Sequence, residues 1–155
     1  FTDEIADPVI ISVNGEKYDY KEINEGYVII TRDWSEGDKV LVNIPMPVRK
    51  VVADKRIVDD TGKIAIQRGP VIYCAEWPDN NPGNVCHLIL KADASLSSEY
   101  VPGLLGGIQV VKTSALRTMN GKIVNEGEDP LIMIPYGYWN NRGPGQMIVW
   151  LPANM

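Results

Sequence analysis

The sequence is poor in the residues on which most catalytic and nucleic-acid sites depend. Its 155 residues include a single histidine, His87, and only two cysteines. Basic residues are also few, since 15 Lys and Arg stand against 20 Asp and Glu and the formal net charge is −5. Nucleic-acid-binding proteins carry a basic face that neutralises phosphates. The basic residues here are scattered singly or in pairs, so we expect no nucleic-acid partner.

Long apolar segments are missing as well. No run approaches the roughly 20 apolar residues that a membrane-spanning helix requires, so we expect no membrane span. The opening segment, residues 1–8, is polar and acidic and lacks the basic and apolar regions of a secretion signal. Because the sequence does not begin with methionine, we expect it to lie within a longer or processed polypeptide.

Helical periodicity is absent too, and strand signals take its place. No window keeps a period of 3.6 residues over the length of a helix, whereas β-branched and aromatic runs alternate with Gly, Pro, Asn and Asp. We therefore predict an all-β fold, an antiparallel, jelly-roll-like β-sandwich. The segment 69–77 is the most apolar and is expected to be buried on both faces. The predicted strands are residues 8–13, 26–34, 39–47, 48–53, 63–67, 69–77, 85–91, 108–116, 131–139 and 146–152.

Turn residues indicate how the first strands pair and where the chain divides. Asn14-Gly15 is a strong hairpin signal after residues 8–13. The segment SEGD predicts a second hairpin, between residues 26–34 and 39–47. Pro45 and Pro47 then mark a seam. We predict two parts, a β-hairpin segment at residues 1–48 and a C-terminal β-sandwich domain at residues 49–155.

Residues 85–91 could return antiparallel to residues 69–77, and this pairing would determine whether the two cysteines can bond. If Cys74 lies opposite Cys86, their Cα atoms come within about 4.5–5.5 Å, a separation that permits a disulfide. A register shifted by one residue places His87 opposite Cys74 and excludes the bond. Both registers remain open from the sequence.

Motifs for metal binding and catalysis are not found. Cys74, Glu76, Cys86 and His87 are metal-ligating types, but adjacent residues of a strand point to opposite faces and the tight pairs of a structural zinc site are missing. His87 accompanies no Gly-x-Ser-x-Gly elbow. Carboxylate pairs are too common among 20 acidic residues to indicate a glycosidase centre. We therefore predict no metal, no cofactor and no catalytic residue in this chain.

The aromatic residues are the remaining candidates for a ligand site. Exposed aromatic faces stack against sugar rings, and Trp77 and Trp139 lie at strand-to-loop junctions, where ligand contacts concentrate. Trp34 and Trp150 are interpreted as packing residues. Packing is also the alternative for the candidates, since an Arg side chain bonds loop carbonyls as readily as a ligand. The candidate carbohydrate contacts are Trp77, Tyr138, Trp139 and Arg142.

Three sequence blocks resemble the C-terminal β region of glycoside hydrolase family 127, whose members are β-L-arabinofuranosidase-like. The blocks are GYVIITRDWSEGDKVLVNIPMPVR (26–49), GKIAIQRGPVIYCAE (62–76) and IPYGYWNNRGPGQMIVWLP (134–152), and they occur in the family's order. In that family an (α/α)6 barrel precedes β-sandwich domains. The resemblance implies that residues 1–48 end a middle β-domain. It also implies that YWNNRGPG connects two strands in a tight turn, where Gly143 and Gly145 allow positive φ.

The resemblance places the chemistry elsewhere. In the family the reaction is attributed to a cysteine nucleophile held on zinc by other cysteines and a glutamate, all within the barrel. Cys74 matches the family's Tyr-Cys strand and not a zinc ligand, so any zinc is expected in the absent barrel. The resemblance implies a non-catalytic accessory region that packs on and supports the upstream barrel of the same polypeptide, in a periplasmic or extracellular protein. The alternative is an independent carbohydrate-binding module for plant-wall oligosaccharide.

Overall fold

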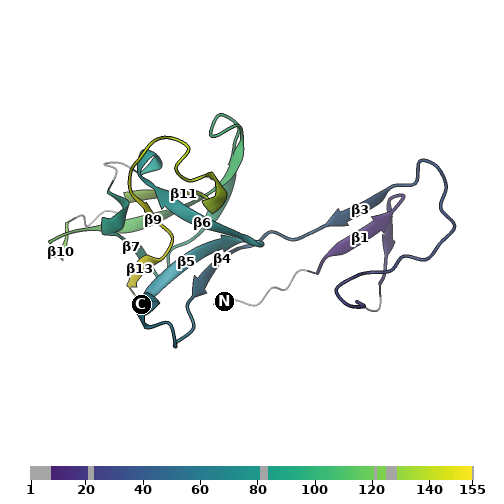
Figure 1. The fold of residues 1–155 in the computed structure, drawn as a ribbon, viewed down its shortest axis with the longest axis horizontal. Coiled ribbons are helices and arrows are strands. Elements are labelled where there is room, and N and C mark those ends of the chain that lie inside the picture. Colours follow the sequence, from purple (N-terminus) through teal and green to yellow (C-terminus); the bar gives the residue numbers. More distant parts are fainter. Residues whose placement is uncertain (1–7, 21–22, 81–83, 121, 125–128, 155) are drawn as a thin grey trace. The chain divides into compact units, whose positions relative to one another are not determined.

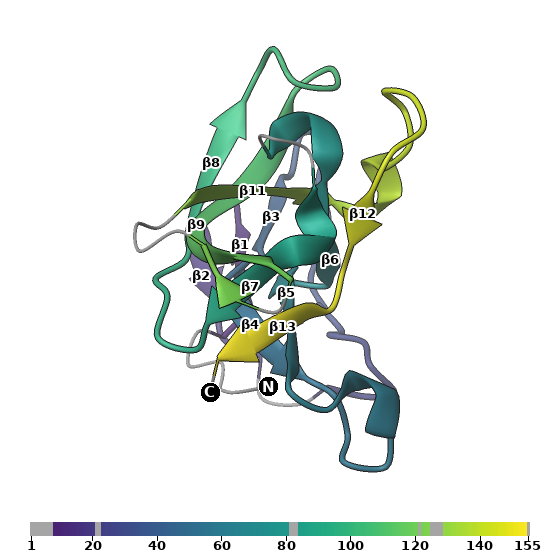
Figure 2. The same ribbon diagram turned by 90° about the vertical axis from the view of Figure 1, so that its left-hand side faces the viewer.

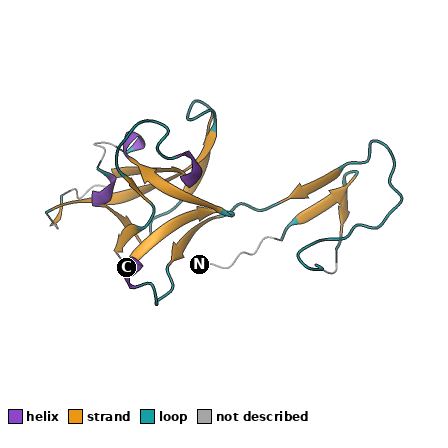
Figure 3. Ribbon diagram, in the orientation of Figure 1, coloured by secondary structure: helices purple, strands orange, loops and turns teal. Residues whose placement is uncertain are grey.

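The protein is almost entirely β, as predicted. The computed structural model describes residues 8–20, 23–80, 84–120, 122–124 and 129–154, and Figure 3 shows strands as their dominant element. Helical structure in these ranges is limited to single 3-10 turns. None of the described helices is long and apolar enough to cross a membrane. The chain divides into two compact units, an N-terminal unit (Ile5–Pro45) and a C-terminal unit that begins at Met46.

The N-terminal unit contains a three-stranded sheet in the order β2-β1-β3. Its strands are β1 (Ile10–Val13), β2 (Glu16–Tyr18) and β3 (Val40–Asn43). The predicted Asn14-Gly15 hairpin is confirmed, because both residues have positive φ (52° and 86°) and Val13 pairs with Glu16. The Asn14 side chain also holds the segment that leads into β3, since it donates to the Asp38 carboxylate and accepts from the Lys39 N–H.

The predicted hairpin between residues 26–34 and 39–47 is wrong. Residues 26–34 form no strand, and β3 pairs instead with β1, with Ile11 opposite Val42. Alternating β-branched residues favour an extended backbone, but they do not specify the partner strand. Pairing with β1 completes a sheet whose central strand buries Ile11 and Val13.

The C-terminal unit is a β-sandwich whose strands follow the order β12-β6-β11-β9-β7-β13-β5-β4. Figure 1 labels these strands except β12, which Figure 2 labels. Strand β5 also pairs with β6, so the hydrogen-bonded path closes on itself. Every pairing is antiparallel except that of β13 with β7. The strands are β4 (Val48–Val52), β5 (Lys63–Arg68), β6 (Val71–Glu76), β7 (Leu88–Lys91), β8 (Ser97–Val101), β9 (Ile108–Met119), β10 (Lys122–Ile123), β11 (Asp129–Pro135), β12 (Met147–Ile148) and β13 (Leu151–Asn154).

Strand β6 is buried on both faces, as predicted from its apolar run. Tyr73 and Ala75 point into the main core cluster, while Cys74 between them points into a second cluster. The neighbouring strand alternates in the same way, with Met133 in the first cluster and Ile134 in the second. This division follows from the two-residue period of a strand. The Tyr73 hydroxyl donates to the Gln109 carbonyl at 2.9 Å, which satisfies its polar tip inside the core.

The hairpin considered between residues 69–77 and 85–91 is not formed. Strand β7 pairs with β9 and β13, and residues Val85–His87 form a 3-10 turn, η3. One edge of β6 is occupied by β11 and the other by β5 and β12, so no edge remains for β7. The buried Asn80 directs the chain away, because its side chain donates to the Glu76 and Ile132 carbonyls and accepts from the Ile132 N–H.

Candidate functional site

The two cysteines lie in different environments and are both free thiols. Cys74 is buried on β6, whereas Cys86 is exposed on η3. Because β6 and β7 do not pair, neither register considered for a disulfide is formed. Burial, with a smaller contribution from the nearby Glu76 and Asp79 carboxylates, raises the pKa of Cys74 to about 12 against the opposing effect of Arg142.

Alkylation is therefore expected to distinguish the two thiols. At pH 8 a thiol with a pKa near 12 is ionised in only about one molecule in ten thousand, and the thiolate is the reactive form. Iodoacetamide should add one carbamidomethyl group to the native chain, at Cys86, and a second only in denaturant. Intact-mass measurement reports the count, and the Cys86→Ser variant should stay unlabelled while folded. Comparable native labelling of Cys74 would contradict this assignment.

The four candidate metal-ligating residues are not brought together. Cys74 packs in the second core cluster, and the Glu76 carboxylate is bonded to Arg142. His87 Nδ1 lies 3.0 Å from the Asn84 side-chain nitrogen. Across the described part of the chain, His, Cys, Asp and Glu do not form any group of three suited to a metal ion.

Glu76, Asp79 and Arg142 of the C-terminal unit form an ion triad, here called the Arg142 triad. Arg142 donates to both Asp79 oxygens, at 2.6 and 2.5 Å, and to Glu76 Oε2. The Glu76 side chain is only 2% exposed and that of Arg142 is 20% exposed. The hydrogen bonds to Asp79 raise the pKa of Arg142 above its usual range, with a further contribution from Glu76. The triad joins residues more than 60 positions apart.

The Arg142 triad fixes the loop of residues 139–146, here called the pinned loop. The second Glu76 oxygen accepts the Asn140 N–H at 2.8 Å. Trp77 donates its backbone N–H to the Gln146 carbonyl at 3.0 Å at the other end of the loop. Figure 2 shows this yellow-green segment extending beyond β12. Both ends of the loop are therefore held by the end of β6 and the 3-10 turn η2 (Trp77–Asp79).

Trp77 lies against the pinned loop and not in open solvent. A Cβ atom placed on Gly145 would lie only 2.0 Å from the indole Cδ1 of Trp77. The indole nitrogen is buried and has no hydrogen-bond partner among the described residues. Both glycines allow positive φ, but only Gly143 has it, at 97°. Gly145 is needed for space beside the indole, and the geometry favours a packing role for Trp77.

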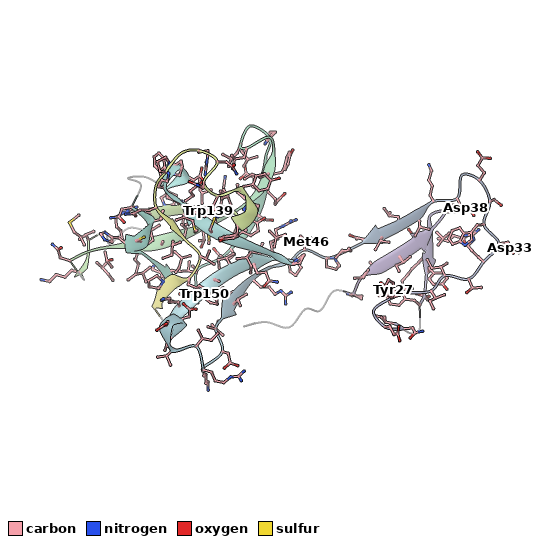
Figure 4. All side chains as sticks on the ribbon, viewed as in Figure 1. Tyr27, Asp33, Asp38, Met46, Trp139 and Trp150 are labelled. Carbon is pink, nitrogen blue, oxygen red and sulfur yellow. The ribbon has the colours of Figure 1, made fainter. Side chains whose placement is uncertain are left out.

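Three exposed aromatic residues precede and begin the pinned loop, and we call them the aromatic ridge. They are Tyr136 and Tyr138 of the turn η4 (Tyr136–Tyr138), 44% and 42% exposed, and Trp139, 38% exposed (Figure 4). The rings of Tyr136 and Trp139 are 6.3 Å apart between centroids and inclined by 31°. Tyr138 and Trp139 are predicted candidates, whereas Tyr136 is not among the candidates predicted from the sequence.

Arg142 is more buried than the residues of the aromatic ridge, since its side chain is only 20% exposed. Its guanidinium donates to two carboxylates, and its buried Nε has no hydrogen-bond partner among the described residues, so the geometry favours a supporting role in the loop. Sequence reasoning missed both carboxylates as its partners. Glu76 and Asp79 are close to the candidate Trp77 in the sequence, but this closeness does not indicate that they bind residue 142.

A different surface dominates the N-terminal unit. Strand β3 exposes consecutive apolar residues, so both of its faces are uncovered in this unit, and Leu41 is 69% exposed. Two aromatic residues, Tyr27 and Trp34, are exposed in this unit, and Tyr27 is labelled in Figure 4. The exposed aliphatic side chains are called the aliphatic surface, and they are Val9, Ile10, Ile23, Ile29, Val40, Leu41, Val42 and Ile44.

Comparison with known proteins identifies both parts of the chain. The sequence model of the "Glycoside hydrolase family 127 C-terminal domain" matches residues 48–152, and that of the "Beta-L-arabinofuranosidase, GH127 middle domain" matches residues 4–46. A non-reducing end β-L-arabinofuranosidase of Bifidobacterium longum subsp. longum is 30% identical over 90% of this chain and 23% of its own length.

Solved structures show the same relationship. A GH127 β-L-arabinofuranosidase from Geobacillus stearothermophilus T6 matches with a TM-score of 0.80 and 35% identity, over 96% of this chain and 25% of the other. A second GH127 β-arabinofuranosidase matches with a TM-score of 0.84 and 39% identity, over 95% and 23%. This chain thus spans about a quarter of the length of these relatives. The chain belongs to glycoside hydrolase family 127, and it comprises the C-terminal domain together with a segment that matches the middle domain.

Proposed function

We propose that this chain is a non-catalytic accessory region of a β-L-arabinofuranosidase-like hydrolase. In this proposal it packs on and supports a catalytic (α/α)6 barrel that lies upstream in the same polypeptide. The relatives are about four times as long as this chain, which leaves most of their length for a catalytic region.

The aliphatic surface is the observation that carries the proposal. Burying apolar surface stabilises a protein by about 25 cal/mol per Å². Many aliphatic side chains exposed together are therefore unfavourable unless another surface covers them. Contiguous exposed apolar surface commonly marks a protein contact. In β3 the residues Val40, Leu41 and Val42 are all exposed, although successive residues of a strand point to opposite faces. Upstream segments of the same polypeptide that cover both faces of β3, beginning with the remainder of the middle domain that residues 4–46 match, account for this pattern.

The polar groups of the C-terminal unit support a non-catalytic role. A glycosidase with two acidic residues needs one carboxyl group to donate a proton and the other to act as nucleophile or base. The two carboxylates that lie together here, those of Glu76 and Asp79, are both bonded to Arg142. Cys74 is buried and Cys86 lies apart from it on η3. We therefore expect the isolated chain to leave aryl β-L-arabinofuranosides intact.

Association with the upstream region tests the proposal. The region encoded before Phe1 would be expressed separately and mixed with this chain, and calorimetry would measure the affinity. Leu41→Ser should weaken the complex at least about tenfold, equivalent to about 1.4 kcal/mol, because it removes an apolar contact of β3. It should leave the stability of the free chain almost unchanged, since Leu41 is exposed there.

The matched control is Val58→Ser, which changes an equally exposed apolar residue of the C-terminal unit. This variant should bind like the parent chain. An upstream reading frame without a barrel region, an absence of association, or equal binding by the Leu41→Ser variant would each reject the proposal.

A further inference from the structure

The aromatic ridge differs in chemistry from the aliphatic surface. The aliphatic surface is rich in Ile, Val and Leu, which suit a contact that excludes water. The ridge consists of Tyr136, Tyr138 and Trp139, each with an apolar ring and a polar tip. Such residues suit a ligand that presents both C–H faces and hydroxyl groups. The two surfaces are therefore suited to partners of different chemical classes.

The ridge is also held in place before any ligand arrives. The Arg142 triad anchors the pinned loop, the Asn140 N–H is bonded to Glu76, and the Asn141 side chain donates to the Tyr138 carbonyl at 2.8 Å. A surface that is already ordered loses less conformational entropy when it binds. A buried ion pair contributes little net stability by itself, so fixing the geometry of this loop is a reasonable role for the triad.

The surroundings of the ridge favour a neutral ligand. The Arg142 triad contains two carboxylates and one guanidinium, so it carries net negative charge, and the whole chain has a net charge of −5. Both observations disfavour phosphate groups and acidic sugars. The exposed side chains of Asn140 and Asn141 flank the ridge. Side-chain amides both donate and accept hydrogen bonds, which matches the hydroxyl groups of a sugar.

We propose that Tyr136, Tyr138 and Trp139, fixed by the Arg142 triad, form a contact surface for a neutral oligosaccharide. Sugar rings stack on the aromatic faces, and the flanking amides bond hydroxyl groups. Trp77 is not part of this surface, because its indole lies against Gly145. The expected kind of sugar, an arabinan-type plant-wall oligosaccharide, follows from the proposed function. The position of the contact surface does not depend on it.

Titration of the complete 155-residue chain tests the inference. Arabinan-derived, xylan-derived and cellulose-derived oligosaccharides would be added up to millimolar concentration and followed by calorimetry and tryptophan fluorescence. Binding is expected for at least the arabinan-derived probe, and Trp139→Ala should weaken it at least about tenfold, as expected for a central aromatic contact. An oligogalacturonate of the same length should bind more weakly because of its charge.

Trp34→Ala is the matched control, since Trp34 is also an exposed tryptophan but belongs to the N-terminal unit. It should bind sugar like the parent chain, and urea unfolding would show that both variants are folded. The inference is overturned if no neutral oligosaccharide binds, or if the Trp139→Ala variant binds the oligosaccharide as tightly as the parent chain does. It is also overturned if no sugar binds and the Trp139→Ala variant associates more weakly with the upstream region. The association assay with Leu41→Ser tests the proposed function separately, so failure of one proposal is distinguishable from failure of the other.

Discussion

Replacing Arg142 with methionine is expected to lower the free energy of unfolding by about 3–5 kcal/mol, the usual cost of leaving a buried charge without its partner. Methionine fills similar apolar volume but cannot neutralise a carboxylate. Glu76 is 2% exposed, so its charge would remain in a poorly solvated position after the change. Asp79 would lose both of its hydrogen bonds to the guanidinium. Urea unfolding, followed by circular dichroism, measures the difference.

Two further variants show whether burial is the cause. Glu76→Gln and Asp79→Asn combined with Arg142→Met remove all three charges of the triad and should recover most of the lost stability, because no uncompensated charge remains at position 76 or at position 79, which is only 10% exposed. Arg56→Met removes an ion pair with Asp54 in which the Arg side chain is 89% exposed. Such exposed pairs contribute at most about 1 kcal/mol, so this control should unfold almost like the parent chain. A loss below about 1 kcal/mol for Arg142→Met would contradict the structural role of the triad.

Gly145→Ala is expected to lower the free energy of unfolding by about 1–3 kcal/mol, the typical cost of overpacking. The added methyl would lie 2.0 Å from Cδ1 and 2.1 Å from Nε1 of the Trp77 indole, so the ring or the pinned loop must move. Urea unfolding measures the loss. Because an indole reports on its surroundings, the tryptophan emission of the folded variant should also shift.

Gly137→Ala provides the control within the same segment. A Cβ atom at Gly137 meets no heavy atom within 4 Å, and Gly137 does not have positive φ. Alanine there should therefore be neutral or slightly stabilising, by up to about 1 kcal/mol, through its effect on the unfolded chain. Equal stability of the two variants would show that the indole does not lie against Gly145.

Two surfaces of different chemistry follow from the structure. The aliphatic surface of the N-terminal unit suits contact with another part of a protein, while the aromatic ridge of the C-terminal unit suits a sugar.

The domain division proposed from Pro45 and Pro47 can be tested by limited proteolysis, which should cut first near the seam between residues 45 and 48. The compact units and the two family matches divide the chain in this same region.

Local features of the chain were predictable from the sequence. Asn14 and Gly15 adopt positive φ at little cost, so their hairpin follows from two residues. The apolar run around Tyr73 and Cys74 predicted a strand buried on both faces, and the described structure confirms it. These signals depend on backbone preference and on side chains next to one another in the chain. The family resemblance also came from local blocks of sequence.

Only the tertiary structure decided which distant segments meet. The pairing of β7 depended on both edges of β6 being occupied, and no local pattern records that. The union of Arg142 with Glu76 and Asp79 spans more than 60 residues, so many other acidic residues were equally plausible partners. Gly145 was required by the position of an indole and not by its own φ. Strand propensity and turn chemistry act within a few residues, whereas edge pairing, ion pairs and close packing are set by the whole fold.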